Sequence, residues 1–554
     1  MIKLKRKKTT LIIFILINIL SYYQFFRIDL TSENRYSLEV ESKRLINELD
    51  DIIHFKIFLH GDIPIEYKKL EQEIYYILDE FRVHSKFITY DFIDPSESEN
   101  IELKNNLYQE LYKKGIQAIP HRTYNGNKSE ETWIFPGITL TYKTKEISTS
   151  LIDKAVTNNT NIIIKNSIEN LEHLLISSIR KVKMVRKKSI GIITGHGETI
   201  DKNIESFKND IAKYYEVEQI KINEKLVALD NFDCIIINNP KEYFSEKDKF
   251  IIDQFIMNGG KSIWLMSGTT ASLDSLESQG EHLVMPFEDR NLHDLMFNYG
   301  IRLNMDLIQD LQAAPIPIVT HYVKEKPQWS FFPWVFFPVI SPTNTHIINT
   351  RIDPIKLQFP SSIDTLSKNS TSNTILLQTS KNSKTITIPT LINLESLKMQ
   401  PNKKEFKEKN KITSVLVEGV FNSVFESRLT HVFKKDTNIN FQAKSMYNKM
   451  IVISDGYFIN NQFSQGVSLP IGFDKHTRQT YGNGEFIINC IDYLMGNDQY
   501  IKIRSKKIAL RLLNKQKVIK EKTYWQIINF ILPIIIISMI TFIFFLKRKK
   551  TYSN

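Results

Sequence analysis

The sequence predicts an α/β protein with two membrane-spanning helices, and three observations point to this class. Strands and helices alternate along most of residues 31–500, which is typical of sheets covered by helices. Two charge-free apolar runs lie near the ends of the 554-residue chain. Apolar residues make up 42% of the sequence and charged residues 24%, a composition that excludes a chain disordered throughout.

The first membrane helix is expected at residues 9–26, which contain LIIFILINILSYYQFF and follow five basic residues. A helix of this length spans about 27 Å, close to the thickness of the hydrocarbon core. The bulky aromatic residues at its end do not fit a signal-peptide cleavage site, so an uncleaved anchor is favoured. The second span is expected at residues 525–546, about 33 Å long, with Pro533 inside it and four basic residues after it.

The net charge of +12 is concentrated at the two ends of the chain. Residues 1–29 carry +5 and residues 501–554 carry +12, which leaves −5 for residues 30–500. A nucleic-acid-binding protein should carry its basic surface on the folded domain. The distribution therefore favours contact with membrane lipid and argues against a nucleic-acid partner.

The basic residues before the first span place the N-terminus in the cytoplasm, and two spans return the C-terminus to the same side. This predicts a two-pass inner-membrane protein with a large periplasmic region. The juxtamembrane segment 501–523 opposes that orientation, because nine Lys and Arg residues lie at 502–522. Contact with anionic headgroups or an acidic partner would account for it. The candidate contact residues are Arg504, Lys506, Lys507 and Arg511.

Residues 31–185 are expected to form the first outer domain, with an element order that resembles a thioredoxin-like layout. The turn after its first strand, His60 to Pro64, contains no cysteine, so thioredoxin-type redox chemistry is not expected. Helices are predicted at 37–49, 67–82, 101–114 and 167–182, strands at 55–59 and 87–93, and a hairpin formed by 132–135 and 138–142 around Pro136-Gly137.

Residues 187–500 are expected to form a second α/β domain around a mostly parallel sheet. Alternation is lost between about 285 and 450, which indicates an irregular insertion. The two cysteines, Cys234 and Cys490, cannot form a disulfide framework or a four-thiolate zinc site. Strands are predicted at 189–194, 216–222, 232–238, 262–266 and 450–458, and helices at 201–215, 246–257 and 486–495.

The turn Gly195-His196-Gly197-Glu198 is the best-placed polar group, because ligands of parallel sheets bind at the carboxyl ends of strands. His196 and Glu198 could bind a ligand, hold a metal or move a proton. The alternative is a tight turn with local hydrogen bonds. Gly260-Lys261-Ser262 does not complete a phosphate loop, because Phe255 stands where the first glycine is needed. No catalytic residue, metal or cofactor is assigned.

Residues 327–338, PQWSFFPWVFFP, combine dense aromatic residues with three prolines. Proline removes backbone donors, so an extended segment is predicted here rather than a helix. The segment is either a buried plug or a contact surface for a partner. The candidate contact residues are Trp329, Phe332, Trp334 and Phe337.

A set of short features spread over nearly the whole chain carries a resemblance to a known family. They are Arg35-Tyr36-Ser37-Leu38, Phe92-Ile93-Asp94-Pro95, Gly195 to Glu198, Asn239-Pro240-Lys241, Gly259-Gly260-Lys261, Trp329, Trp334, Pro338, Ser454-Asp455-Gly456 and the segment from Tyr481 through Asn489 into the second span. With these features the sequence resembles the gliding-motility-associated ABC transporter auxiliary, or substrate-binding, protein family GldG. The resemblance implies a GldF-like permease and a GldA-like cytoplasmic ATPase as partners. It also implies a second domain with a class I glutamine-amidotransferase-like sheet, but no cysteine stands at the nucleophile elbow, so that activity is not expected.

The predicted function is a non-enzymatic auxiliary membrane subunit of an ABC transporter complex involved in bacterial gliding motility. Two alternatives remain open. One is a hydrolase-like α/β enzyme that uses His196 and Glu198, and the other is a pure scaffold of the motility machinery.

Overall fold

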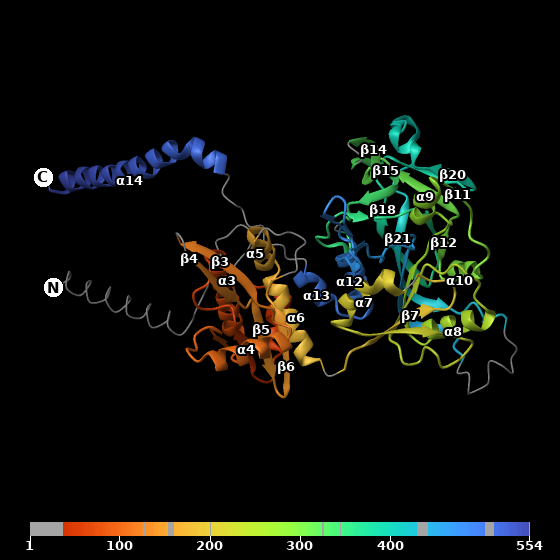
Figure 1. The fold of residues 1–554 in the computed structure, drawn as a ribbon, viewed down its shortest axis with the longest axis horizontal. Coiled ribbons are helices and arrows are strands. Elements are labelled where there is room, and N and C mark those ends of the chain that lie inside the picture. Colours follow the sequence, from red (N-terminus) through yellow and green to blue (C-terminus); the bar gives the residue numbers. More distant parts are fainter. Residues whose placement is uncertain are drawn as a thin grey trace. The chain divides into compact units, whose positions relative to one another are not determined.

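The computed structural model describes most of the chain, which divides into two compact units, residues 1–507 and 508–554 (Figure 1). A mixed α/β structure with several sheets is found, as predicted. The first expected membrane helix, residues 9–26, lies outside the described residues. The described residues are 37–125, 128–152, 160–184, 186–199, 201–323, 326–343, 345–428, 441–504 and 515–552.

A four-stranded sheet in the order β2-β1-β5-β6 forms the centre of the N-terminal part. β1 pairs in parallel with β2 and antiparallel with β5, and β5 pairs antiparallel with β6. The closing helix predicted at 167–182 is instead two helices that meet at Asn170. The bounds are β1 Ile53–Ile57, β2 Ile88–Phe92, β5 Gly137–Tyr142, β6 Lys145–Ser150, α2 Val40–Asn47, α3 Ile65–His84, α4 Ile101–Lys113, α5 Thr160–Glu169 and α6 Leu171–Lys183.

The hairpin predicted around Pro136-Gly137 is wrong. β4 (Lys128–Ile134) pairs with β3 (Ile119–Asn125), whereas β5 enters the main sheet and pairs with β1 and β6. Gly137 serves a close approach rather than a reverse turn, because a Cβ there would lie 2.5 Å from the Ile116 side chain. The reverse turn falls after β5, where Lys143 has a φ of +53°.

A seven-stranded sheet in the order β18-β21-β22-β10-β9-β7-β8 forms the centre of the C-terminal part. Strands β8, β7, β9, β10 and β22 run in parallel, so the mostly parallel sheet is confirmed. The chain returns to this sheet in β22, which begins before the predicted strand 450–458 and ends at Ile453. β21 and β18 extend one edge antiparallel. The bounds are β7 Ser189–Thr194, β8 Glu216–Lys221, β9 Cys234–Asn238, β10 Lys261–Leu265, β18 Thr371–Gln378, β21 Ile412–Asn422 and β22 Lys444–Ile453.

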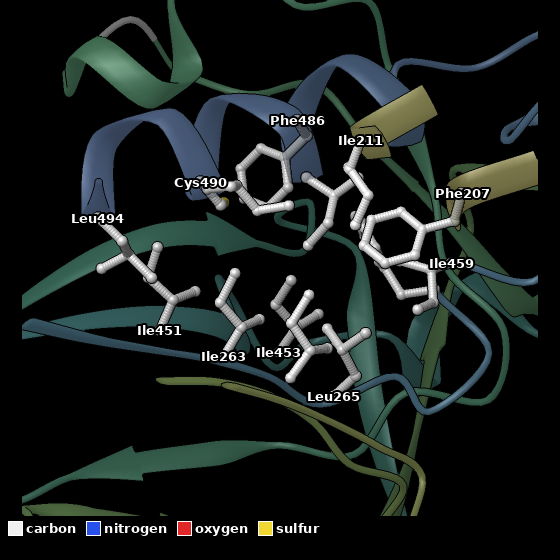
Figure 2. Packing of buried hydrophobic residues seen from close by; sticks show 14 of the residues in the cluster. Phe207, Ile211, Ile263, Leu265, Ile451, Ile453, Ile459, Phe486, Cys490 and Leu494 are labelled. Atoms are coloured by element: carbon white, nitrogen blue, oxygen red, sulfur yellow. The ribbon is translucent and has the colours of Figure 1, made fainter. Parts of the chain in front are cut away.

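Helices cover both faces of this sheet, and alternate side chains of each strand point to opposite faces. On one face, Ile263 and Ile451 pack with Phe207 of α7 (Glu205–Ala212) and Phe486 of α12 (Asn483–Leu494) (Figure 2). On the other face, Trp264 and its neighbours pack with α8 (Glu246–Met257) and α10 (His293–Asn298). A short 3-10 helix, Asp201–Ile204, precedes α7. The two faces bury the sheet completely at β9, as expected of a parallel sheet.

Short sheets fill the region between β10 and β22, in place of regular alternation. The longest is the antiparallel pair β14–β15, to which β16 adds. The bounds are α9 Leu273–Gln279, β11 Glu281–Val284, β12 Ile301–Leu303, β13 Asp306–Asp310, β14 Ala313–Val323, β15 Lys326–Ile340, β16 Ile355–Lys356, β17 Ile363–Thr365, β19 Ser383–Thr387, β20 Thr390–Asn393, β23 Phe463–Ser464, β24 Val467–Ser468, β25 Phe473–Asp474 and β26 Gln479–Thr480.

The second unit contains the helix α14 (Lys515–Tyr552), which includes the predicted span 525–546. Its stretch Lys520–Lys550 has a mean hydropathy of 2.7 in its most apolar window and is long enough to cross a membrane. Pro533 lies inside the helix without ending it, as membrane helices allow.

Candidate functional site

His196 lies in the turn after β7 and is held from three directions. Its Nδ1 lies 3.3 Å from Glu198 Oε1, and its Nε2 lies 3.1 Å from Asp248 Oδ2 on α8. Its backbone N–H donates to Glu198 Oε2 at 2.6 Å. The imidazole also stacks on the ring of Phe244, with centroids 3.7 Å apart and planes 7° from parallel. The structure therefore brings together His196 and Glu198, the two residues predicted from the sequence.

Two residues absent from the sequence-based site, Asp248 and Phe244, complete this centre. Asp248 is fixed by the start of α8, where its backbone N–H donates to Ser245 Oγ at 3.1 Å. Its Oδ1 accepts the backbone N–H of Glu224 at 2.8 Å. Burial lowers the pKa of His196, but the hydrogen bonds to Glu198 and Asp248 outweigh it, so the pKa is raised. The centre favours an imidazolium between two carboxylates.

The geometry of the turn ties two loops of the sheet together. Gly195 and Gly197 have φ values of +113° and +72°, which a residue with a Cβ rarely adopts. This path brings the carbonyl of His196 within 2.8 Å of the backbone nitrogen of Lys241, in the loop after β9. β7 and β9 flank the point where the strand order reverses, the usual ligand crevice of such sheets. In this protein the loop after β7 and the loop after β9 are hydrogen-bonded to each other and close that crevice.

The His196 centre has little capacity left for chemistry on a ligand. The residue is only 6% exposed, and both ring nitrogens already face carboxylate oxygens. No group of three or more His, Cys, Asp or Glu side chains in the described part of the chain is arranged to hold a metal ion. The arrangement acts as a buried connector between the β7 turn, the β9 loop and α8.

Replacing His196 by alanine should lower the free energy of unfolding by about 2–4 kcal/mol, because two buried carboxylates lose their partner. The raised pKa means that protonated His196 contributes stability that is complete below about pH 6.5 and is lost as pH rises through the higher folded-state value. Urea unfolding of the full chain in detergent at several pH values should show the difference from wild type shrinking as pH rises. The exposed His321→Ala variant is the control. A His196→Ala protein as stable as wild type at low pH would contradict this role.

The position after β9 has the backbone of a strained turn but no nucleophile. Asn239 has a φ of +53°, and its N–H donates to the carbonyl of Leu265 at 2.7 Å. Cys234 lies inside β9 and Cys490 inside α12, both fully buried. Burial raises the pKa of both thiols, which keeps them protonated. Neither cysteine is placed to act as a nucleophile.

The aromatic segment forms β15, an extended strand as predicted, and its side chains divide between core and surface. Trp334 and Phe337 are buried and pack with Phe359 at ring-centroid distances of 5.4 and 5.2 Å. Phe332 is partly buried against the same cluster, whereas Trp329 is 55% exposed. Of the four candidate contact residues, only Trp329 therefore presents most of its side chain to solvent.

Of the four basic candidates, Arg504 ends the helix α13 (Asp498–Arg504). Lys506, Lys507 and Arg511 lie outside the described residues. Their contact with lipid or a partner stays a prediction.

A cavity of about 550 Å³ lies beside β10, and no sequence pattern indicates it. It is lined by Met266, directly after β10, and by residues before, within and after α10. Arg290 lines it and is only 3% exposed. The sequence around Arg290 reads Glu288-Asp289-Arg290-Asn291, which is typical of a solvated loop, so its burial is visible only in the fold.

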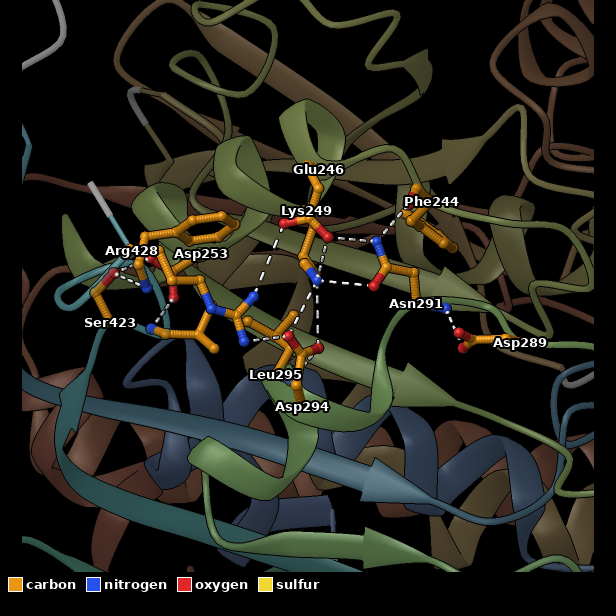
Figure 3. A network of polar contacts seen from close by, with 12 residues as sticks. Phe244, Glu246, Lys249, Asp253, Asp289, Asn291, Asp294, Leu295, Ser423 and Arg428 are labelled. Carbon is orange, nitrogen blue, oxygen red and sulfur yellow. Dashed lines mark hydrogen bonds and ion pairs between the residues drawn. The ribbon is translucent and has the colours of Figure 1, made fainter. Parts of the chain in front are cut away.

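A polar network fixes the segment that carries Arg290 (Figure 3). The buried Lys249 of α8 donates to Asn291 Oδ1 at 2.9 Å and lies 3.1 Å from Asp294 Oδ2. Asn291 in turn donates to the carbonyl of Phe244 at 3.0 Å, and the Phe244 N–H donates to the Arg290 carbonyl at 3.1 Å. The residue that stacks on His196 thus also holds the backbone of Arg290.

These features define an α/β protein with a hydrogen-bonded histidine centre, a cavity beside the parallel sheet and an apolar C-terminal helix able to cross a membrane. The chain belongs to the family described as an ABC-type uncharacterized transport system, an auxiliary-component family whose model matches residues 187–490. A model for a domain of unknown function matches residues 32–141. The family indicates a transport-associated, non-enzymatic role with permease and ATPase partners, and with the apolar helix it indicates membrane association.

No curated protein matches the sequence. Among solved structures, the chain is similar to the mmIFT52 N-terminal domain, with 13% identity and a TM-score of 0.33 over 56% of this chain and 97% of that one. It is also similar to the exo-beta-1,4-mannosidase Op5Man5 from Opitutaceae bacterium strain TAV5, with 7% identity and a TM-score of 0.21 over 80% of this chain and 50% of that one. At these TM-scores neither likeness bears on the function of this chain.

Proposed function

We propose that this chain is the non-enzymatic, substrate-binding-type auxiliary membrane subunit of a gliding-motility ABC transporter of the GldG type. Its partners would be a GldF-like permease and a GldA-like cytoplasmic ATPase. The observation that carries the proposal is the family match over 187–490, followed in the same chain by the apolar helix α14. The motility assignment rests on the sequence resemblance.

In this proposal the protein spans the inner membrane twice, with both termini in the cytoplasm and the large region in the periplasm. That region would comprise a thioredoxin-like domain at 31–185 and an amidotransferase-like domain at 187–500. Neither domain has a cysteine at the position where such chemistry would need one. The turn after β1 contains no cysteine, and Cys234 is buried inside β9. Both would therefore serve binding and assembly. The basic segment 501–523 would contact membrane lipid.

The test replaces both histidine-centre residues conservatively, as His196→Gln and Glu198→Gln, in the chromosomal gene. Glutamine keeps hydrogen-bonding capacity, so folding is better preserved than with alanine. A non-enzymatic subunit should retain gliding and the same membrane complex. Loss of gliding with the protein folded and assembled would instead favour the hydrolase-like alternative, and unchanged gliding after deletion of the whole gene would remove the motility role.

A further inference from the structure

Arg290 is a buried cation that forms no ion pair with a carboxylate in the described part of the chain. Its Nη1 donates to the carbonyl of Pro240 at 3.1 Å, and its Cζ lies 4.8 Å from the centre of the Phe287 ring. A guanidinium has five N–H donors, so most of its capacity is unused here.

An unpaired buried charge is costly, because it loses its hydration without gaining a counter-charge. Burial lowers the pKa of Arg290 to about 10, so the group remains charged at neutral pH. Other buried cations of this protein show the usual solution: Arg180 pairs with Asp492, and Lys249 pairs with Asp294. Arg290 departs from that pattern and lines the cavity instead.

Seven of the ten other residues that line the cavity are apolar. The lining includes three flexible thioether side chains, which adapt to ligands of varied shape: Met266, Met296 and Met305. Leu292 and Phe297 add further apolar surface. A volume of about 550 Å³ falls within the range of small-molecule sites, which combine apolar walls with a few polar anchors.

A second arginine at the opening also favours an anion. The exposed Arg302 of β12 lines the cavity there, beside the exposed His293 of α10. Asp294 of α10 is engaged with Lys249 and Arg428. Asp364 of β17, which lies opposite Arg302 in the β12–β17 pair, accepts a hydrogen bond from Asn304. The site thus combines a buried guanidinium, a cationic opening and an apolar interior.

We propose that the cavity beside Arg290 binds a small organic carboxylate with an apolar body, with the carboxylate on the guanidinium. The planar fork of arginine matches a carboxylate in a bidentate manner, and the methionine-rich wall takes up the apolar body. The proposal goes beyond the transporter assignment and does not depend on it, because binding can be measured on the chain without a permease or an ATPase.

The test is isothermal titration of the full chain in lipid nanodiscs with 3-phenylpropionate, and with its neutral amide as the matched ligand. The carboxylate should bind about tenfold to a hundredfold more tightly than the amide, since only it forms a charged hydrogen-bonded pair. Arg290→Met should lose a similar factor, whereas the exposed Arg44→Met should bind as wild type does.

A second variant keeps the test decisive if Arg290→Met does not fold. Met305 is 45% exposed at the edge of the cavity, so Met305→Trp should block entry without disturbing the core. It should weaken binding of the carboxylate by a similar factor. The proposal is overturned by equal affinity for acid and amide, by unchanged affinity in folded Arg290→Met or Met305→Trp, or by the absence of binding at millimolar carboxylate.

Discussion

Replacing Arg180 by methionine should lower the free energy of unfolding by about 3–5 kcal/mol, because it leaves a buried carboxylate without its cation. Arg180 lies in α6, and its Nη1 is 3.2 Å from Asp492 Oδ1 in α12. The Tyr215 hydroxyl donates to the same oxygen at 2.6 Å, and the Tyr500 ring lies 4.0 Å from Arg180 Cζ. The pair joins α6, which precedes the family-matched region, to α12, which lies mostly inside it.

Urea unfolding of the full chain in detergent measures this effect, with Arg44→Met as the control. Arg44 is a largely exposed arginine in an ion pair with Glu48, and solvent screens such a pair, so its loss should leave stability close to that of the wild type. The double variant Arg180→Met, Asp492→Asn should recover part of the loss, because the remaining charge is removed while an acceptor for Tyr215 stays. A single variant as stable as wild type would show that this buried pair does not hold the two parts together.

Trp334→Ala should lower the free energy of unfolding by about 3–5 kcal/mol, the cost of removing a large buried ring. Trp334 is 2% exposed and packs edge-on against Phe336, Phe337 and Phe359. Trp334→Phe should cost much less, because the indole nitrogen has no hydrogen-bond partner among the described residues to lose. The part of the aromatic segment around Trp334 therefore acts mainly as a buried plug.

Trp329→Ala is the matched control in the same strand, since its ring is more than half exposed. Its effect on unfolding by urea should stay within about 0.5 kcal/mol. If Trp334→Ala left stability unchanged while weakening partner binding, the segment would be a contact surface rather than a plug, and the packing account of β15 would be wrong.

Helices and strands with a clear apolar periodicity and clear end signals could be located from the sequence. β7 and α8 have the bounds that were predicted, because apolar periodicity is clear and Ser245 and Gly259 mark the ends of α8. The Pro136-Gly137 hairpin was misplaced because glycine also serves close packing, here against Ile116. A turn signal alone cannot distinguish these two uses.

The His196 centre and the Arg290 cavity could likewise be predicted from the sequence only in part or not at all. Spacing alone placed His196 beside Glu198. Asp248 of α8 lies 52 positions after His196 in the sequence and joins the two residues only in the folded protein. The burial of Arg290 follows from tertiary contacts, since its sequence neighbours are charged and polar. Local sequence carries no information on which distant helix covers such a residue.

Affinity purification of the tagged full chain from native membranes distinguishes a transporter subunit from a protein without these partners. We expect a permease and an ATPase of one ABC system to be recovered with it, in amounts comparable to the chain itself. Recovery of the intact, folded chain without a permease and an ATPase would contradict its role as a transporter subunit.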